Sequence, residues 1–242
     1  MKNTIKYILQ KVLGFQFYLY VFSLFKIRTL RNDSNEKDFF HFLSLLKDGE
    51  GSVLDVGANI GIMTAHLGQH LPNTSIHAFE PMPTNISVLR KIIAKFNLKL
   101  VKLHEIAVGE TSGSVKMILP QNGKTKMQGL SHVKHDSITE WNEGEEFEVE
   151  LDTLDNQLKT EKIQGIKIDV ENFEYFALKG AKELLERDHP IIYAELWDNQ
   201  NRTNCFDLLT SLSYQAFIVK NNQLISFDSS QHISQNFIFI SN

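Results

Sequence analysis

Five acidic residues stand near the ends of short apolar segments, where uncharged side chains are the rule. A buried carboxylate is costly unless it is paired or hydrogen-bonded, so each of these acids needs a partner or a ligand. Carboxylates in such places can accept hydrogen bonds from ribose hydroxyls, attract a cationic group, or take a proton from a reacting hydroxyl. The five residues are Asp55, Glu80, Asp169, Glu171 and Glu195.

A glycine-rich turn follows the first acid. Gly57 and Gly61 flank Ala58-Asn59-Ile60, and a helix is predicted to begin there. Glycine lets a backbone approach a ligand closely, and asparagine is the residue after glycine that best tolerates a left-handed conformation. The turn alone is a weak signal, because Asn59 occupies the place of the middle glycine in the dinucleotide fingerprint.

The charges near this turn narrow the choice of ligand. Glu80 stands 19 residues after Gly61, where a carboxylate can bind ribose hydroxyls, and Ala107 lies where an adenine edge would rest. Asp55 beside the turn would repel a pyrophosphate and attract an ammonium group. S-adenosyl-L-methionine has a ribose, an adenine and a cationic amine, and no phosphate, so it fits these residues better than a nicotinamide dinucleotide. The simpler interpretation of Asp55 is a helix cap.

These acids are positioned by alternating strands and helices. Apolar patterns predict strands at residues 52–56, 75–79, 99–108, 165–170 and 190–196, and helices at residues 35–47, 60–70, 84–96, 173–187 and 202–212. This order predicts a parallel sheet with right-handed crossovers, and in such sheets ligands bind beyond the carboxyl ends of the strands.

Two regions depart from the alternation. Residues 115–119 and 147–151 resemble strands, and the polar, turn-rich segment between them is either a mobile lid or plain surface. The strands at residues 214–219 and 236–240 have no helix between them, so an antiparallel hairpin is expected at the sheet edge.

Five segments, VLDVGANIG, HAFEP, AVG, IKIDVENFEYFALKGA and YAELW, together resemble the FkbM family of S-adenosylmethionine-dependent methyltransferases. The resemblance covers roughly residues 53–240. It implies a Rossmann-like, seven-stranded methyltransferase sheet, mostly parallel with an antiparallel C-terminal hairpin and helices on both faces. It also implies O-methylation of a hydroxyl, often on a sugar or polyketide. The family pattern D-x-E-G-x-E reads DVENFE here, with Asn172 in place of glycine.

The acids of the later strands are the candidates for chemistry. Asp169 and Glu171 would take or orient the acceptor's proton, and Glu195 would help to hold the sugar. Glu171 and Glu174 also suit a helix N-terminus without any catalytic role. Lys167 is expected to pair with a neighbouring acid. The three candidate acids would suit Mg²⁺, but nothing in their spacing requires a metal, and none is predicted.

Composition excludes several classes of function. The net charge is −4 without a dense basic run, which argues against a nucleic-acid partner. The single cysteine, Cys205, excludes an internal disulfide and a cysteine-cluster metal site, and fits a reducing cytoplasm.

The first 31 residues carry Lys and Arg, many apolar and aromatic residues, and no acid. They predict a helical extension, residues 1–34, before a methyltransferase domain at residues 35–242. The extension either packs on the domain or on a second subunit, as in a homodimer, or lies peripherally on the inner face of the membrane.

The preferred function is an S-adenosylmethionine-dependent O-methyltransferase acting on a saccharide, a glycolipid or a related natural product. One alternative is a nicotinamide-dependent oxidoreductase on the same sheet. Another is a non-catalytic, membrane-associated binding protein.

Overall fold

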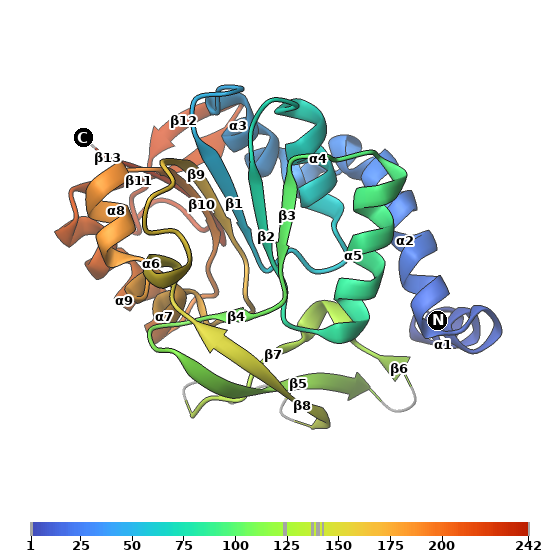
Figure 1. The fold of residues 1–242 in the computed structure, drawn as a ribbon. Coiled ribbons are helices and arrows are strands. Elements are labelled where there is room, and N and C mark those ends of the chain that lie inside the picture. Colours follow the sequence, from blue (N-terminus) through green and yellow to red (C-terminus); the bar gives the residue numbers. More distant parts are fainter. Residues whose placement is uncertain (1, 123–124, 137, 139–140, 142, 242) are drawn as a thin grey trace.

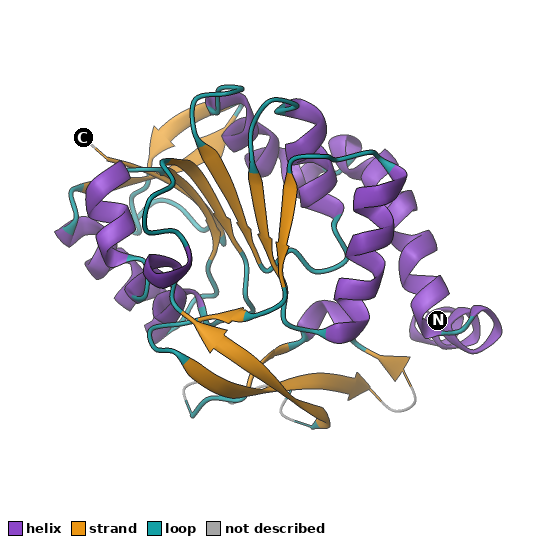
Figure 2. Ribbon diagram, in the orientation of Figure 1, coloured by secondary structure: helices purple, strands orange, loops and turns teal. Residues whose placement is uncertain are grey.

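The computed structural model describes residues 2–122, 125–136, 138, 141 and 143–241. Within these residues eight strands form one sheet in the order β12-β11-β13-β10-β9-β1-β2-β3. Helices cover both faces of this sheet, and a smaller sheet crosses its lower end (Figures 1 and 2).

The sheet is assembled from two series of elements. The first comprises α3 (Lys37–Leu45), β1 (Ser52–Val56), α4 (Ile62–His70), β2 (Ile76–Phe79), α5 (Pro83–Lys95) and β3 (Val101–His104). The second comprises α6 (Leu154–Gln157), β9 (Ile163–Ile168), α7 (Glu174–Lys179), α8 (Lys182–Asp188), β10 (Ile191–Glu195), α9 (Gln200–Ser211), β11 (Tyr214–Lys220), β12 (Gln223–Ser226) and β13 (Asn236–Ser241).

The pairing confirms a mostly parallel sheet with antiparallel strands at its C-terminal end. Strands β3, β2, β1, β9 and β10 run parallel, and β13 is antiparallel to both β10 and β11. The sheet has one strand more than the seven expected, because residues 223–226 pair with β11 as β12. This strand is only four residues long and partly exposed, so its apolar pattern is weak.

Side chains alternate between the two faces of the central strands, as the pleat requires. On β1, Val53 packs with Phe39 and Phe42 of α3. Its neighbour Leu54 points to the other face, where α7, α8 and α9 contribute the core. All five residues of β1 are buried, which explains why apolar residues, Val53, Leu54 and Val56, face both sides of the sheet.

The middle of the chain forms the smaller sheet. Its strands are β4 (Ala107–Val108), β5 (Gly113–Asn122), β6 (Thr125–Lys126), β7 (His132–Val133) and β8 (Gly144–Asp152). β5 and β8 contain the strands expected at residues 115–119 and 147–151, while the polar connection expected between them lies partly outside the described residues. β5 and β8 pair antiparallel over most of their length. The predicted strand at residues 99–108 is divided, because β3 ends at His104 and β4 pairs with β8.

The helix predicted at residues 173–187 is also divided, into α7 and α8. The break falls at Gly180, where any side-chain carbon would collide with the carbonyl oxygen of Gly109. The close approach of these two backbones therefore explains both the glycine and the interruption.

The N-terminal region forms α1 (Lys2–Leu13) and α2 (Phe15–Thr29), followed by the 3₁₀ turns η1 (Leu30–Asn32) and η2 (Ser34–Glu36). Gly14 separates the helices with a φ of 74°. α2 lies along α4 and α5, where Leu19 packs with Val88 and Ile92 (Figure 1). Among the described residues no single helix has the length and apolar composition to cross a membrane; α1 and α2 pass that test only together, as a pair bent by 119°.

Candidate active site

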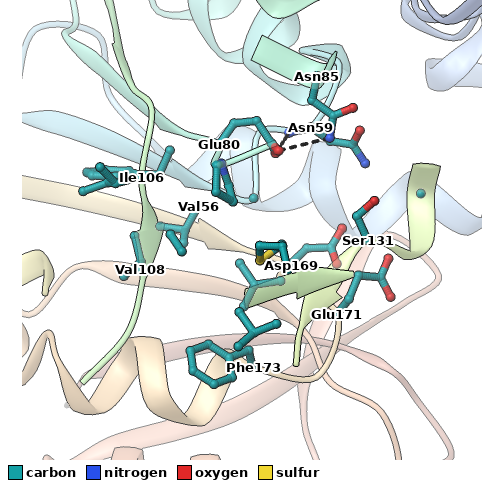
Figure 3. Close-up of a pocket in the computed structure, with 18 of the residues that line it drawn as sticks. Val56, Asn59, Glu80, Asn85, Ile106, Val108, Ser131, Asp169, Glu171 and Phe173 are labelled. Atoms are coloured by element: carbon teal, nitrogen blue, oxygen red, sulfur yellow. Dashed lines mark hydrogen bonds between the residues drawn. The ribbon is translucent and has the colours of Figure 1, made fainter. Parts of the chain in front are cut away.

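A cavity with about 570 Å³ of empty space, including the space at its mouth that is open to solvent, lies where the carboxyl ends of β1, β2 and β9 meet the smaller sheet. Figure 3 shows its two ends. Ile106 and Val108 lie at one end, and Asp169, Glu171 and Ser131 lie at the other. Glu80 stands between them. The cavity therefore joins an apolar compartment to an acidic one, at the edge of the sheet where ligands are expected.

The glycine-rich turn forms one wall of this cavity. Gly57, Asn59 and Gly61 have positive φ values of 78°, 49° and 81°. A side-chain carbon at Gly57 would collide with the carbonyl oxygen of Asp169, so only glycine fits there. Gly57 and Asn59 line the cavity, whereas Gly61 is the N-cap of α4 and packs beneath the turn against Leu89.

Glu80 is held rigidly in the wall. Its carboxylate accepts hydrogen bonds from the backbone N–H groups of Asn59 (2.8 Å) and Met82 (2.9 Å) and from Nδ2 of Asn85 (3.0 Å). Burial raises the pKa of Glu80, and these three donors oppose the rise. Because a carboxylate has about four acceptor positions, Glu80 keeps capacity for a ligand hydroxyl. Sequence reasoning missed Asn85, which carries no distinguishing pattern.

Asp55 has partners other than the ammonium group expected. It is fully buried, with Oδ1 3.1 Å from Nζ of Lys167 and Oδ2 accepting a hydrogen bond from Thr64 (2.6 Å). It does not line the cavity. The structure corrects the expectation that Asp55 meets the ligand, because Lys167 neutralises the charge of Asp55 inside the protein. This ion pair agrees with the expectation that Lys167 pairs with a neighbouring acid.

Lys167 connects this buried pair to the glycine-rich turn. Its Nζ donates a hydrogen bond to the carbonyl oxygen of Gly57 at 2.8 Å. Burial alone would lower the pKa of Lys167, but the charges of Asp55 and Asp169 raise it above the ordinary value. The ammonium group is thus held charged between β1 and β9. Asp55 acts on the site by fixing Lys167, which in turn fixes Gly57.

The apolar compartment is built from both sheets. Phe79 lines it from the main sheet, Ile106 lies in the connection after β3, and Val108, Met117 and Val133 line it from the smaller sheet. Ala107 also lies in the lining, at the place predicted for an adenine edge. Gln128, Gly129 and Ser131 were missed in the sequence because their segment is polar and rich in turn residues.

The turn DVENFE is held by its own side chains. Glu171 and Asn172 have positive φ values of 52° and 73°. Glu174 is buried, and its carboxylate accepts hydrogen bonds from the N–H groups of Val170 (2.9 Å) and Asn172 (3.2 Å). Asn172 Oδ1 accepts a hydrogen bond from Asn199 Nδ2 (2.7 Å). Asn172 thus adopts a left-handed conformation that glycine also tolerates, and its side-chain amide bonds to Asn199 at the start of α9.

The acids beyond β9 and β10 form an electrostatic cluster. Burial, followed by the negative charges of Asp169 and Glu195, raises the pKa of Glu171 to about 9. Burial, followed by Asp169 and Glu36, raises the pKa of Glu195 to about 7. Asp169 and Glu171 line the cavity, whereas Glu195 belongs to the cluster of acids but does not line the cavity. Near neutral pH this group of acids holds at least one proton and can exchange it.

Burial also raises the pKa of Glu174 to about 8, although that carboxylate is used by the turn. In the part of the chain that the structure describes, no group of three or more His, Cys, Asp and Glu side chains is arranged to hold a metal ion.

The family model of the methyltransferase FkbM domain matches residues 55–221 of this chain. Methyltransferase 1 of Beauveria bassiana is 25% identical over 142 residues, which cover 53% of this chain and 57% of that protein. The chain thus spans a little over half the length of this relative.

Two solved structures share the fold. Methyltransferase FkbM from Methylobacillus flagellatus superposes with a TM-score of 0.56 at 14% identity, over 99% of this chain and 59% of that one. The O-methyltransferase from Bacillus cereus, determined in complex with SAH, gives a TM-score of 0.50 at 14% identity, over 99% and 98% of the two chains. At these identities the likeness concerns the fold alone.

Proposed function

The chain belongs to the FkbM family of methyltransferases, and we propose that it is an S-adenosyl-L-methionine-dependent O-methyltransferase acting on a saccharide, a glycolipid or a related natural product. The observation that carries this proposal is the shape of the cavity. A hydrogen-bonded carboxylate, Glu80, lies between an apolar compartment and a cluster of acids, beside a turn that admits only glycine at residue 57.

The lining fits this cofactor. Ile106, Ala107 and Val108 would hold an adenine, and Glu80 would accept hydrogen bonds from the ribose hydroxyls. Asp169 lies against the glycine turn and supplies the negative charge that the sequence had assigned to Asp55. When bound, S-adenosyl-L-methionine supplies an electrophilic methyl group. The structure of the O-methyltransferase from Bacillus cereus, which was determined in complex with SAH, supports S-adenosyl-L-methionine as the cofactor.

The chain's own residues would position and deprotonate the acceptor. A hydroxyl is a weak nucleophile, so a base that removes its proton speeds the transfer. Glu171 lines the cavity, is protonated near neutral pH and can donate a hydrogen bond to the acceptor, whereas Glu195, with a pKa of about 7, does not line the cavity and exchanges a proton within the cluster of acids. The negative charge of Asp169 raises the pKa of both Glu171 and Glu195. We assign proton transfer and acceptor orientation to these three acids together.

A nicotinamide-dependent oxidoreductase is the weaker alternative. A diphosphate beside Gly57 would share the cavity with the carboxylate of Asp169, and the repulsion would oppose binding. Asn59 also occupies the position of the middle glycine in the dinucleotide turn. Both features disfavour a dinucleotide.

The N-terminal helices support contact with a membrane surface. Their exposed apolar side chains include Val12 (75% exposed), Phe17 (52%) and Phe25 (60%), and the segment before Asp33 carries cations and no acid. A basic, aromatic-rich helix pair of this kind suits an anionic lipid surface. Such contact would bring a glycolipid acceptor close to the cavity.

Co-sedimentation with vesicles containing phosphatidylglycerol tests the membrane contact. The double variant Val12→Ser, Phe25→Ser should remain in the supernatant while the wild-type chain sediments. Ile233→Ser, which removes a fully exposed apolar side chain elsewhere, is the matched control and should sediment. Equal sedimentation of all three proteins would contradict the contact.

Mass spectrometry of glycans and lipids tests the transfer itself. Cells that produce the wild-type chain are compared with cells that produce Glu171→Ala. A compound heavier by one methylene group in the first cells alone is expected. Glu150→Ala, at an exposed position on β8, is the control and should leave that compound present. The absence of any such mass difference, with both proteins produced at equal levels, would contradict the proposal.

A further inference from the structure

A second cavity, with about 960 Å³ of empty space including the space open to solvent, adjoins the first on the far side of the glycine-rich turn. The two cavities share Gly57, Asn59, Gln128, Gly129 and Asp169 in their walls. A molecule in the second cavity therefore reaches the acidic end of the first one, where the proposed chemistry takes place. The second cavity has no role in the cofactor assignment above.

The N-terminal helices build most of the outer wall of this cavity. Tyr18, Leu19 and Phe22 of α2 face it, and Ile62 and Met63 of α4 lie across from them. This lining is apolar and aromatic. Phe22 is also 38% exposed, so it belongs both to the cavity wall and to the exposed apolar surface of α1 and α2. The cavity thus opens beside the surface proposed above to meet lipid.

Three lysines line this cavity, and their partners differ. Lys167 pairs with Asp55, and Lys26 pairs with Asp33 at 2.9 Å. The Nζ atom of Lys6 lies 3.7 Å from the thioether sulfur of Met127. No acid of the described residues pairs with Lys6, which is partly buried on α1. Burial lowers its pKa, and an anionic ligand would offset that desolvation.

The charges give the cavity a direction. Lys6 lies on α1, which lies beside the smaller sheet at β6, where Gln10 donates a hydrogen bond to the carbonyl oxygen of Lys126 at 3.1 Å (Figure 1). Asp169 lies at the inner end, at the carboxyl edge of the main sheet. A ligand with an anionic group at one end and a hydroxyl at the other would meet a cation and an acid in that order.

We propose that the second cavity is the acceptor site, and that the acceptor is an amphipathic hydroxyl compound whose anionic group pairs with Lys6 and whose apolar part packs on Phe22. The proposal rests on the proposed methyltransferase function and narrows its substrate class. The anionic group is directed away from Asp169, and the hydroxyl toward it. Entry is from the side of the exposed apolar surface of α1 and α2.

Calorimetry with dodecyl phosphate, below its micellar concentration, tests this site on the full chain saturated with S-adenosylhomocysteine. One molecule should bind per chain. Lys6→Gln and Phe22→Ala should each weaken binding roughly tenfold, because each removes one partner of the probe. Lys11→Gln and Phe25→Ala are the matched controls, since these exposed residues on the same helices do not line the cavity, and they should bind as the wild type does.

Three results would overturn the proposal. The first is that dodecyl phosphate does not bind. The second is that all four variants weaken its binding equally, which would indicate adsorption to the surface. The third is that Lys6→Gln weakens the binding of S-adenosylhomocysteine, which would assign the cavity to the cofactor. Circular dichroism confirms that each variant is folded. Failure of S-adenosylhomocysteine to bind the wild-type chain would instead refute the proposed function, and the probe titration without it would then judge the cavity separately.

Discussion

Replacing Glu171 by glutamine should stabilise the protein at pH 7.5. Glu171 is a largely buried acid whose pKa is raised from 4.5 to about 9 by burial and by the charges of Asp169 and Glu195. Glutamine has nearly the same shape as the protonated acid and carries no ionisable proton. The substitution therefore removes a titration that opposes folding.

The sign and size follow from proton binding. Below pH 4.5 the folded and unfolded chains both hold the proton of Glu171, and no penalty exists. Above that pH the unfolded chain releases the proton while the folded chain keeps it, so stability falls until the folded pKa is reached. Between pH 4.5 and pH 7.5, an interval of about 3 pH units, the free energy of unfolding falls by about 1.4 kcal/mol per unit. The upper bound of this loss at pH 7.5 is therefore about 4 kcal/mol.

Urea denaturation at pH 5 and pH 7.5 measures this effect. Glu171→Gln should be more stable than the wild type by about 1–4 kcal/mol at pH 7.5 and by less than about 1 kcal/mol at pH 5. Glu150→Gln, the exposed control, should stay within about 0.5 kcal/mol of the wild type. An equal gain at both pH values, or a loss at pH 7.5, would show that the penalty assigned to Glu171 is absent.

Three further substitutions test individual contacts. Glu80→Ala should weaken S-adenosylhomocysteine binding roughly tenfold or more by calorimetry, because a buried hydrogen-bond partner is lost. Glu171→Ala should leave this binding nearly unchanged. Similar losses of binding in both variants would refute the assignment of Glu80 to the cofactor and Glu171 to the acceptor. Lys167→Met should cost about 3–5 kcal/mol in urea unfolding, since Asp55 is then buried without its partner, and a loss below about 1 kcal/mol would contradict the ion pair. Asn172→Ala should be about 1 kcal/mol less stable than Asn172→Gly, because alanine resists a φ of 73°; thermal unfolding of the two variants decides this.

The alternation of strands and helices was predictable because each central strand is buried on both faces and each helix on one. Those constraints act on local sequence, and β1, β2 and β9 were identified within two residues. The break at Gly180 was not predictable in this way, since its cause is the backbone of Gly109, distant in the chain. In the smaller sheet the apolar residues 115–119 and 147–151 predicted β5 and β8, but not their full lengths or their pairing, because both strands continue into exposed polar residues.

The candidate site was predictable where backbone geometry required special residues. Gly57 and Asn59 lie in the cavity wall as expected, because left-handed conformations restrict residue choice. The direction of Asp55 was not predictable, because a strand residue's partner depends on its neighbour in the sheet, and Lys167 lies opposite Asp55 on β9. Gln128 and Ser131 reach the cavity only because the smaller sheet folds across the main one.

The central claim is that the cavity at the carboxyl ends of β1, β2 and β9 binds S-adenosyl-L-methionine through Glu80. Calorimetric titration of the wild-type chain with S-adenosylhomocysteine and, separately, with NAD tests it most directly. The account predicts saturable binding of S-adenosylhomocysteine with one site per chain, lost in Glu80→Ala, and no binding of NAD. Binding of NAD alone, or binding of S-adenosylhomocysteine that Glu80→Ala leaves unchanged, would contradict it.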